Sequence, residues 1–237
     1  MSRIGVFGGM GPSATVDFMD KLVRLTPATR DQDHLPVIVA SLPRIADRST
    51  AILGRGGDPL PALLEGIDLL NRIEVGVVAV PCNSAHHWYD QMAARSRAPV
   101  LHIAQACVAA VPAGATRVAV LGTRGALHSG FYQAALRERG VEPVVPDPDT
   151  VQVQVDDCIR LIKAGDLPGG TAAFDRMLAL LAADGVTAAI LGCTELPIAA
   201  RDAAPGPIRL IDSTLELARA TVAFALSRGW NLPAWAS

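Results

Sequence analysis

An internal repeat is the feature that most limits how this chain can fold. The segment 75–84 aligns with the segment 186–195, and the alignment places Cys82 on Cys193, 111 residues later. In both segments a mainly apolar run comes shortly before a cysteine, and a polar residue follows the cysteine directly. The helical stretches before them match as well, and a similar offset relates the apolar run at 4–7 to the run at 118–121. A repeat of this length predicts two similar structural units.

Short apolar runs alternate with amphipathic stretches along the whole chain, which predicts an α/β fold. The expected strands lie at 4–7, 37–40, 75–80, 100–103, 118–121, 141–145 and 188–191. Strands with almost continuous apolar residues are buried on both faces, so we expect parallel sheets flanked by helices. Together with the repeat, this predicts two pseudo-symmetric domains of this kind, with the active site in the cleft between them. The first domain is expected to comprise 1–97 plus 208–237, and the second 98–207. The last helix, near 213–228, is expected to pack back onto the first half.

Composition excludes several classes of function. Half of the 237 residues are hydrophobic and the formal net charge is only −2, which excludes a disordered chain. The absence of Lys/Arg clusters argues against a nucleic-acid partner, and no apolar run is long enough for a membrane span. The N-terminal segment lacks the pattern of a signal peptide, so we expect a cytoplasmic protein.

The four cysteines are the residues to explain. They contain no C-x-x-C pair, which argues against disulfides and against a metal site. Cys107 and Cys158 have no motif around them and are expected to pack in the core. Cys82 and Cys193 each follow a strand, and ligands bind beyond the carboxyl ends of parallel strands. Two thiols that face one carbon atom suit a two-base proton transfer, although a cysteine is also commonly a small buried apolar residue.

The sequence resembles the cofactor-independent aspartate/glutamate racemase family, and in particular its aspartate racemase branch. The resemblance covers nearly the whole chain and depends on the motifs GGMGP at 8–12, DRS at 47–49, ILG at 52–54, PCNSAH at 81–86, SGFY at 129–132 and GCTELP at 192–197. The two cysteine motifs together are highly specific. The glycine motif alone would be weak.

This resemblance implies a homodimeric enzyme that racemises aspartate, glutamate or a close analogue, with no cofactor and no metal. Cys82 and Cys193 would then be the acid/base pair. The substrate-binding residues implied by the family pattern are Met10, Arg48, Asn83, Ser84, Thr123, Lys163 and Thr194. Among these, Arg48 and Lys163 match the cations that hold a side-chain carboxylate in aspartate-selective members.

Two positions depart from the family pattern. Ser84 stands where the family commonly has Thr, which keeps the hydroxyl group. Ala126 stands where it commonly has a second hydroxyl residue, which weakens any assignment of one specific substrate. The presence of both cysteines favours racemisation over the chemistry of single-cysteine relatives.

Several other signals allow two interpretations. The segment 9–14 fits a dinucleotide-binding pattern, but the acidic residue expected at the end of the next strand is missing, which favours a turn beside the substrate. His86 could tune Cys82, or be purely structural, whereas His86 and His87 are adjacent and poorly placed to share a metal. Glu195 and Asp47 could orient groups in the cleft, or serve as caps and surface ion pairs. The segment 42–58 could be a lid or an ordinary loop.

Two rival functions remain open from the sequence. One is a lyase or isomerase of a dicarboxylic acid that uses a single cysteine. The other is an amino-acid-binding protein without catalytic activity, because a two-lobed cleft also describes a solute receptor.

Overall fold

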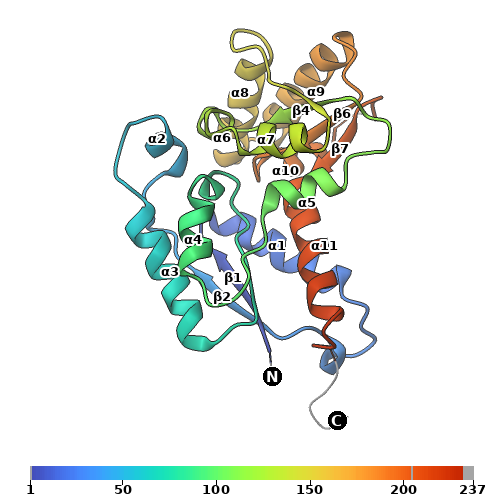
Figure 1. Ribbon diagram of the computed structural model, residues 1–237. Helices are drawn as coiled ribbons and strands as arrows, with labels where there is room; N and C mark the ends of the chain where they lie inside the picture. Colours follow the sequence, from blue (N-terminus) through green and yellow to red (C-terminus); the bar gives the residue numbers. More distant parts are fainter. Residues whose placement is uncertain (1, 204, 232–237) are drawn as a thin grey trace.

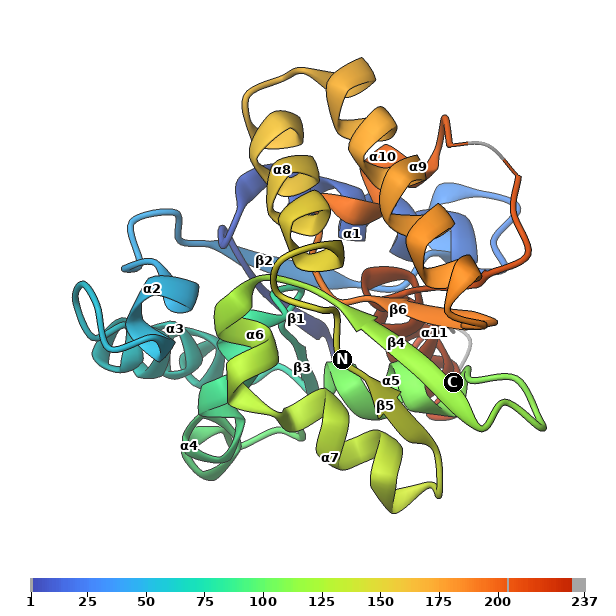
Figure 2. The same cartoon turned by 90° about the horizontal axis from the view of Figure 1, so that it is seen from above.

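Two parallel β-sheets form the framework of the protein. The computed structural model describes residues 2–203 and 205–231 (Figure 1, Figure 2). The first sheet has the order β2-β1-β3 and the second the order β5-β4-β6-β7. The strands are β1 (Ile4–Gly8), β2 (Val37–Ser41), β3 (Val77–Ala79), β4 (Arg117–Leu121), β5 (Glu142–Val144), β6 (Ala188–Leu191) and β7 (Arg209–Asp212). The expected α/β class with two similar units is therefore confirmed.

Helices connect these strands and cover both faces of each sheet. Those before β4 are α1 (Pro12–Leu25), η1 (Asp31–Asp33), α2 (Arg48–Ile52), α3 (Leu60–Ile73), η2 (Ser84–Trp88), α4 (Tyr89–Arg95) and α5 (Ile103–Ala109). Those after β4 are α6 (Arg124–Ser129), α7 (Phe131–Glu138), α8 (Val151–Lys163), α9 (Leu167–Ala183), α10 (Leu196–Ala200) and α11 (Ser213–Leu226). Their apolar positions recur at helical spacing; in α3, for example, Leu63, Ile67 and Leu70 are fully buried.

Three hydrophobic cores hold the molecule together. A central core lies between the two sheets and contains residues of β1, β3, β4 and β6 with α1, α5, α7 and α11. The outer face of each sheet has a core of its own. Alternation along β4 shows the division, because Val118 and Val120 face the central core while Ala119 and Leu121 face the outer one. The two units therefore share a substantial apolar interface.

The sheet pairing corrects the expected strand pattern in two places. The expected strand at 100–103 is reduced to a single parallel bridge between Val100 and Val78, which adds that segment to the first sheet, although it was assigned to the second domain. Strand β7 was not predicted, and it pairs with β6 of the second sheet, although 208–237 was assigned to the first domain. Val100 and Ile211 of β7 are 111 residues apart, so they occupy equivalent places in the repeat.

The helix that follows each of these two segments packs on the opposite unit. Helix α5 follows Val100 and contacts α7 of the second unit, whereas α11 follows β7 and contacts α1 and β3 of the first. The two helices also pack against each other (Figure 1). The expectation that the last helix returns to the first half is thus confirmed.

A glycine turn after β1 brings the backbone toward the cleft. Gly9 has a φ angle of +91°, and a Cβ atom there would lie 2.3 Å from the backbone nitrogen of Leu42, so only glycine fits. Its N–H group donates a hydrogen bond of 2.8 Å to Thr15 Oγ1 at the start of α1. Within the described ranges, no helix is long and apolar enough to cross a membrane.

Candidate active site

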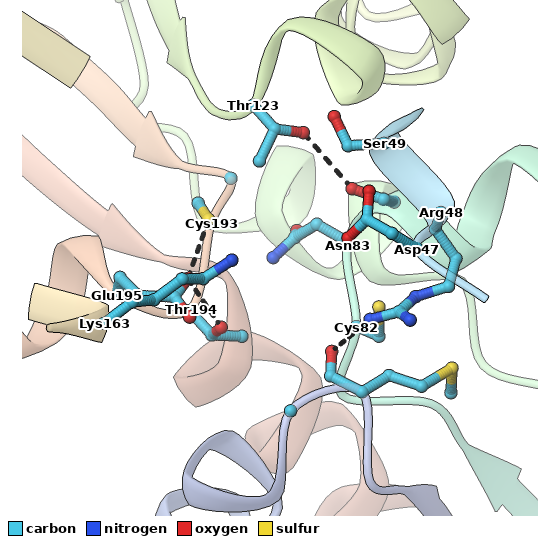
Figure 3. Close-up of a pocket in the computed structure, with 14 residues that line it drawn as sticks. Asp47, Arg48, Ser49, Cys82, Asn83, Thr123, Lys163, Cys193, Thr194 and Glu195 are labelled. Carbon is cyan, nitrogen blue, oxygen red and sulfur yellow. Dashed lines mark hydrogen bonds between the residues drawn. The ribbon is translucent and has the colours of Figure 1, made fainter. Parts of the chain in front are cut away.

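A cavity of about 160 Å³ lies at the carboxyl ends of the parallel strands, between the two units. Its walls come from both units and from the segment 42–58. The residues that line it are Met10, Gly11, Asp47, Arg48, Ser49, Cys82, Asn83, Ser84, Thr123, Lys163, Gly192, Cys193, Thr194 and Glu195. Figure 3 shows Cys82 and Cys193 on opposite sides of this space.

The two cysteines occupy equivalent positions in the repeat. Cys82 follows β3 and precedes η2, while Cys193 follows β6 and precedes α10. Both side chains are almost fully buried, with 5% of Cys82 and 7% of Cys193 exposed. Burial is the largest influence on both thiols and raises the pKa of each above its usual value.

The charged neighbour of Cys82 is a cation. The Arg48 guanidinium stands beside it and opposes the effect of burial on the pKa of the thiol. Three backbone carbonyls hold this guanidinium: Nη1 donates to Ile45 and Ala46, and Nη2 donates to Met10. The buried Nε atom has no hydrogen-bond partner. Arg48 is thus fixed in place and keeps donor capacity for an anion.

The neighbour of Cys193 is an anion. The Sγ atom of Cys193 donates a hydrogen bond of 2.9 Å to Oε2 of Glu195, and the hydroxyl of Thr194 donates to the same oxygen at 3.1 Å. After burial, the carboxylate of Glu195 is the next largest cause that raises the pKa of Cys193, while Lys163 acts in the opposite direction. This arrangement favours the thiol form of Cys193, because the thiolate would face a carboxylate.

Hydroxyl and amide groups form the wall between the thiols. Ser84 Oγ and Thr123 Oγ1 are 3.3 Å apart and link the two units across the cleft (Figure 3). Thr123 also caps α6 by accepting a hydrogen bond from the N–H group of Ala126. Asn83 lies next to Cys82 and is buried. These side chains offer several hydrogen-bond donors to a small polar ligand.

Helix α2, within the segment 42–58, contributes charged residues to the wall of the cavity. Its N-cap Asp47 accepts hydrogen bonds from the backbone N–H and the hydroxyl of Thr50. Partial burial acts to raise the pKa of Asp47, but these hydrogen bonds and the nearby cations outweigh it, so the pKa is lowered. Ser49 Oγ accepts a hydrogen bond of 3.1 Å from the N–H group of Gly125 in α6. The helix therefore spans the cleft and contacts the second unit.

Comparison with known proteins decides the family. Residues 7–221 match the model of a family described as Asp/Glu/Hydantoin racemase. The chain belongs to this racemase family. Its named members are isomerases, and the resemblance expected from the cysteine motifs is confirmed.

Relatives of this racemase match it over most or all of their length. The broad specificity amino-acid racemase RacX of Bacillus subtilis is 30% identical over 230 residues, which are 94% of this chain and 98% of RacX. An aspartate racemase of Picrophilus torridus superimposes with a TM-score of 0.79 at 28% identity, covering 98% of this chain and 100% of that one. A glutamate racemase of Francisella tularensis, solved with D-glutamate, shares the fold with a TM-score of 0.72 at 19% identity, over 97% of this chain and 82% of that one.

The structure brings all nine expected site residues to the racemase cavity: Met10, Arg48, Asn83, Ser84, Thr123, Lys163 and Thr194 together with the two cysteines. Asp47 and Glu195, for which the sequence left a role in the cleft open, also line it, and so does Ser49, which was not expected. The position of Glu195, two residues after Cys193, was the available signal. Ala126 does not line the cavity; it is buried beneath Thr123, where its backbone supports the helix cap.

The remaining signals resolve into structural roles. His86 places Nδ1 2.9 Å from the backbone carbonyl oxygen of Cys82, and burial lowers the pKa of His86 to about 3. Cys107 lies in the central core and Cys158 in the outer core of the second unit. Across the described ranges, no three His, Cys, Asp or Glu side chains are grouped to hold a metal ion.

Proposed function

We propose that this racemase interconverts the enantiomers of aspartate, glutamate or a close analogue by proton transfer between Cys82 and Cys193, without pyridoxal phosphate. The observation that supports it most is the pair of thiols on opposite sides of one small cavity (Figure 3). A two-base racemisation needs one group to remove the α-proton and another to supply a proton to the opposite face. The repeat supplies one such group from each unit.

Burial raises the pKa of both thiols, but the charges beside them differ. In this proposal Cys82, beside Arg48, is the thiol that loses its proton first, and Cys193, beside Glu195, keeps its proton. In the first direction the Cys82 thiolate takes the α-proton, and the C–H electron pair remains on the α-carbon. The Cys193 thiol then gives its proton to the opposite face of that carbon, and its S–H electron pair stays on sulfur. The reverse direction starts from the Cys193 thiolate and the Cys82 thiol.

The carbanion formed between these steps needs stabilisation of its carboxylate. The donors of Asn83, Ser84, Thr123 and Thr194 surround the space between the thiols and would hold the α-carboxylate and the amino group. The buried walls exclude water, which strengthens these interactions in the transition state.

The size and charge of the cavity support a small acidic substrate. Its volume of about 160 Å³ is well below the roughly 300–1,000 Å³ of pockets for drug-sized ligands. Arg48 and Lys163 would hold the side-chain carboxylate, Arg48 through its guanidinium, whose Nε has no partner in the protein, and Lys163 as a point charge. The name of the Picrophilus torridus relative supports aspartate, whereas the name of RacX supports a wider range of amino acids.

The test is α-proton exchange in D2O with a panel of L- and D-amino acids, followed by NMR and by chiral analysis of the products. We expect deuteration and inversion of aspartate, glutamate or a close analogue. Exchange on no member of the panel would refute the racemase function, and binding without exchange would instead support an amino-acid-binding protein. Size-exclusion chromatography with light scattering tests the homodimer that the family resemblance implies.

Cysteine variants test the two-base mechanism. Cys82→Ser and Cys193→Ser should each lower racemisation in both directions by about 10²- to 10⁴-fold, because each removes a general acid/base. Cys158→Ala is the matched control, since this cysteine lies in the outer core, and it should retain activity. Activity that survives the loss of one cleft cysteine would favour a single-cysteine lyase or isomerase.

A further inference from the structure

The SGFY motif at 129–132 contains a side chain that the proposed mechanism leaves without a role. The hydroxyl of Tyr132 donates a hydrogen bond of 2.5 Å to Oδ1 of Asn83, the residue next to Cys82. At the other end of this amide, Nδ2 donates to Ser213 Oγ at 3.1 Å. Both ends of the Asn83 amide are therefore held by side chains that do not line the cavity.

These bonds are shielded from water. Tyr132 is 1% exposed, Ser213 is fully buried and Asn83 is 4% exposed. Burial raises the pKa of the Tyr132 hydroxyl well above its ordinary value, so this group stays protonated and can donate. A buried amide with a lost partner is costly, which favours one orientation over the alternatives.

The three residues come from separate parts of the fold. Asn83 lies on the loop after β3, Tyr132 on α7 of the second unit, and Ser213 at the start of α11, which returns to the first unit. The contact thus ties one wall of the cavity to the interface between the units. Cys107 of α5 is a further neighbour of the Tyr132 hydroxyl, with Sγ at 3.6 Å.

We propose that Tyr132 and Ser213 are positioning residues, which hold the Asn83 amide so that the second hydrogen on Nδ2 points into the cavity toward the substrate carboxylate. This inference rests on the proposed function. Ser213 takes one of the two Nδ2 hydrogens, and Tyr132 fixes which end of the amide is the oxygen. Asn83 lines the cavity beside Cys82, where negative charge on the carboxylate grows as the α-proton leaves.

The kinetic test is a double-mutant cycle. Tyr132→Phe keeps the ring and removes the hydroxyl, and we expect kcat/KM to fall by about 5- to 20-fold, mainly through kcat. In an Asn83→Ala background, Tyr132→Phe should cause no further loss, because its effect passes through the missing amide. Equal losses in both backgrounds would overturn the proposal. Cys107→Ala removes a neighbour of the hydroxyl that takes no part in these hydrogen bonds of the Asn83 amide, and it should leave kcat/KM within about two-fold of the parent.

A second measurement, which does not depend on activity, monitors the side-chain amide of Asn83 by NMR. In a spectrum of ¹⁵N-labelled protein, the Asn83 side-chain resonances are those that disappear in Asn83→Ala. We expect Tyr132→Phe to shift these resonances and to speed their exchange with water, with Ser213→Ala acting in the same direction. Unchanged resonances would overturn the positioning role. If the resonances respond but the parent exchanges no amino acid α-proton, the proposed function fails while the contact itself is upheld.

Discussion

Gly125→Ala tests whether the docking of α2 on α6 is needed for activity. A Cβ atom at this position would lie 2.6 Å from both the carbonyl oxygen and Oγ of Ser49, and 2.7 Å from its Cα. Since ordinary contacts begin near 3.4 Å, helix α2 must move away by about 0.8 Å. Two of the three contacts are backbone atoms, so a change of side-chain rotamer at Ser49 cannot relieve the clash.

The shift matters because the same helix carries Arg48 at the cavity. A misplacement of about 1 Å can cost about 10²-fold in rate, so we expect Gly125→Ala to lower kcat/KM by about 10- to 100-fold. Ser49→Ala removes only one hydrogen bond, and its loss should be about 2- to 10-fold.

The assay measures kcat/KM for the best substrate of the exchange panel, with thermal unfolding monitored in parallel. Gly57→Ala is the matched control within the same segment, because its Cβ would meet Ala46 at an ordinary 3.6 Å, and it should keep parental kinetics. A Gly125→Ala enzyme with an unchanged unfolding temperature and with kcat/KM within two-fold of the parent would refute the requirement for docking.

Three further predictions address charge, substrate and stability. Glu195→Gln should move the alkaline limb of the kcat/KM–pH profile to lower pH. In the parent enzyme burial and the Glu195 carboxylate both raise the pKa of Cys193, and the variant loses the second effect; an unmoved limb would show that Glu195 does not influence the reacting thiol. Lys163→Gln should raise KM for an acidic amino acid about 10-fold and change KM for a neutral one much less, as steady-state kinetics would show. Phe174 of α9 lies in the outer core of the second unit, and Phe174→Ala should lower the unfolding free energy by about 3–5 kcal/mol in chemical denaturation. Leu180→Ala, on the exposed side of the same helix, should lower it by only about 0.5 kcal/mol.

The repeat made much of the fold predictable. Apolar runs that alternate with amphipathic stretches specify parallel sheets, and six of the seven expected strands are present. The exception, at 100–103, is limited to one bridge because α5 begins at Ile103. Strand β7 was missed because its sequence, RLID, is short and half polar. Its place in the sheet depends on pairing with β6, which is a tertiary contact.

The candidate site was predictable where the chain itself carries the motif. Cys82, Asn83 and Ser84 are consecutive, as are Cys193 and Thr194, and each group follows an expected strand. By contrast, the contact of Tyr132 with Asn83 joins residues 49 positions apart and depends on how α7 packs over the first unit. Local sequence carries no information about that geometry. The same holds for the clash that makes Gly125 necessary.

The backbone symmetry of the site contrasts with the asymmetry of its charges. The repeat places the two cysteines at equivalent positions, yet a guanidinium stands beside Cys82 and a carboxylate beside Cys193. This difference cannot favour one product, because the two enantiomers have equal free energy in water and kcat/KM must therefore be equal in both directions.

Under the proposed mechanism, the charges instead separate the pKa values of the two thiols. At low pH both sulfurs carry protons, so no base is available; at high pH both are thiolates, so no acid remains. Arg48 and Glu195 widen the interval between these limits, and activity depends on the single-thiolate form that they stabilise.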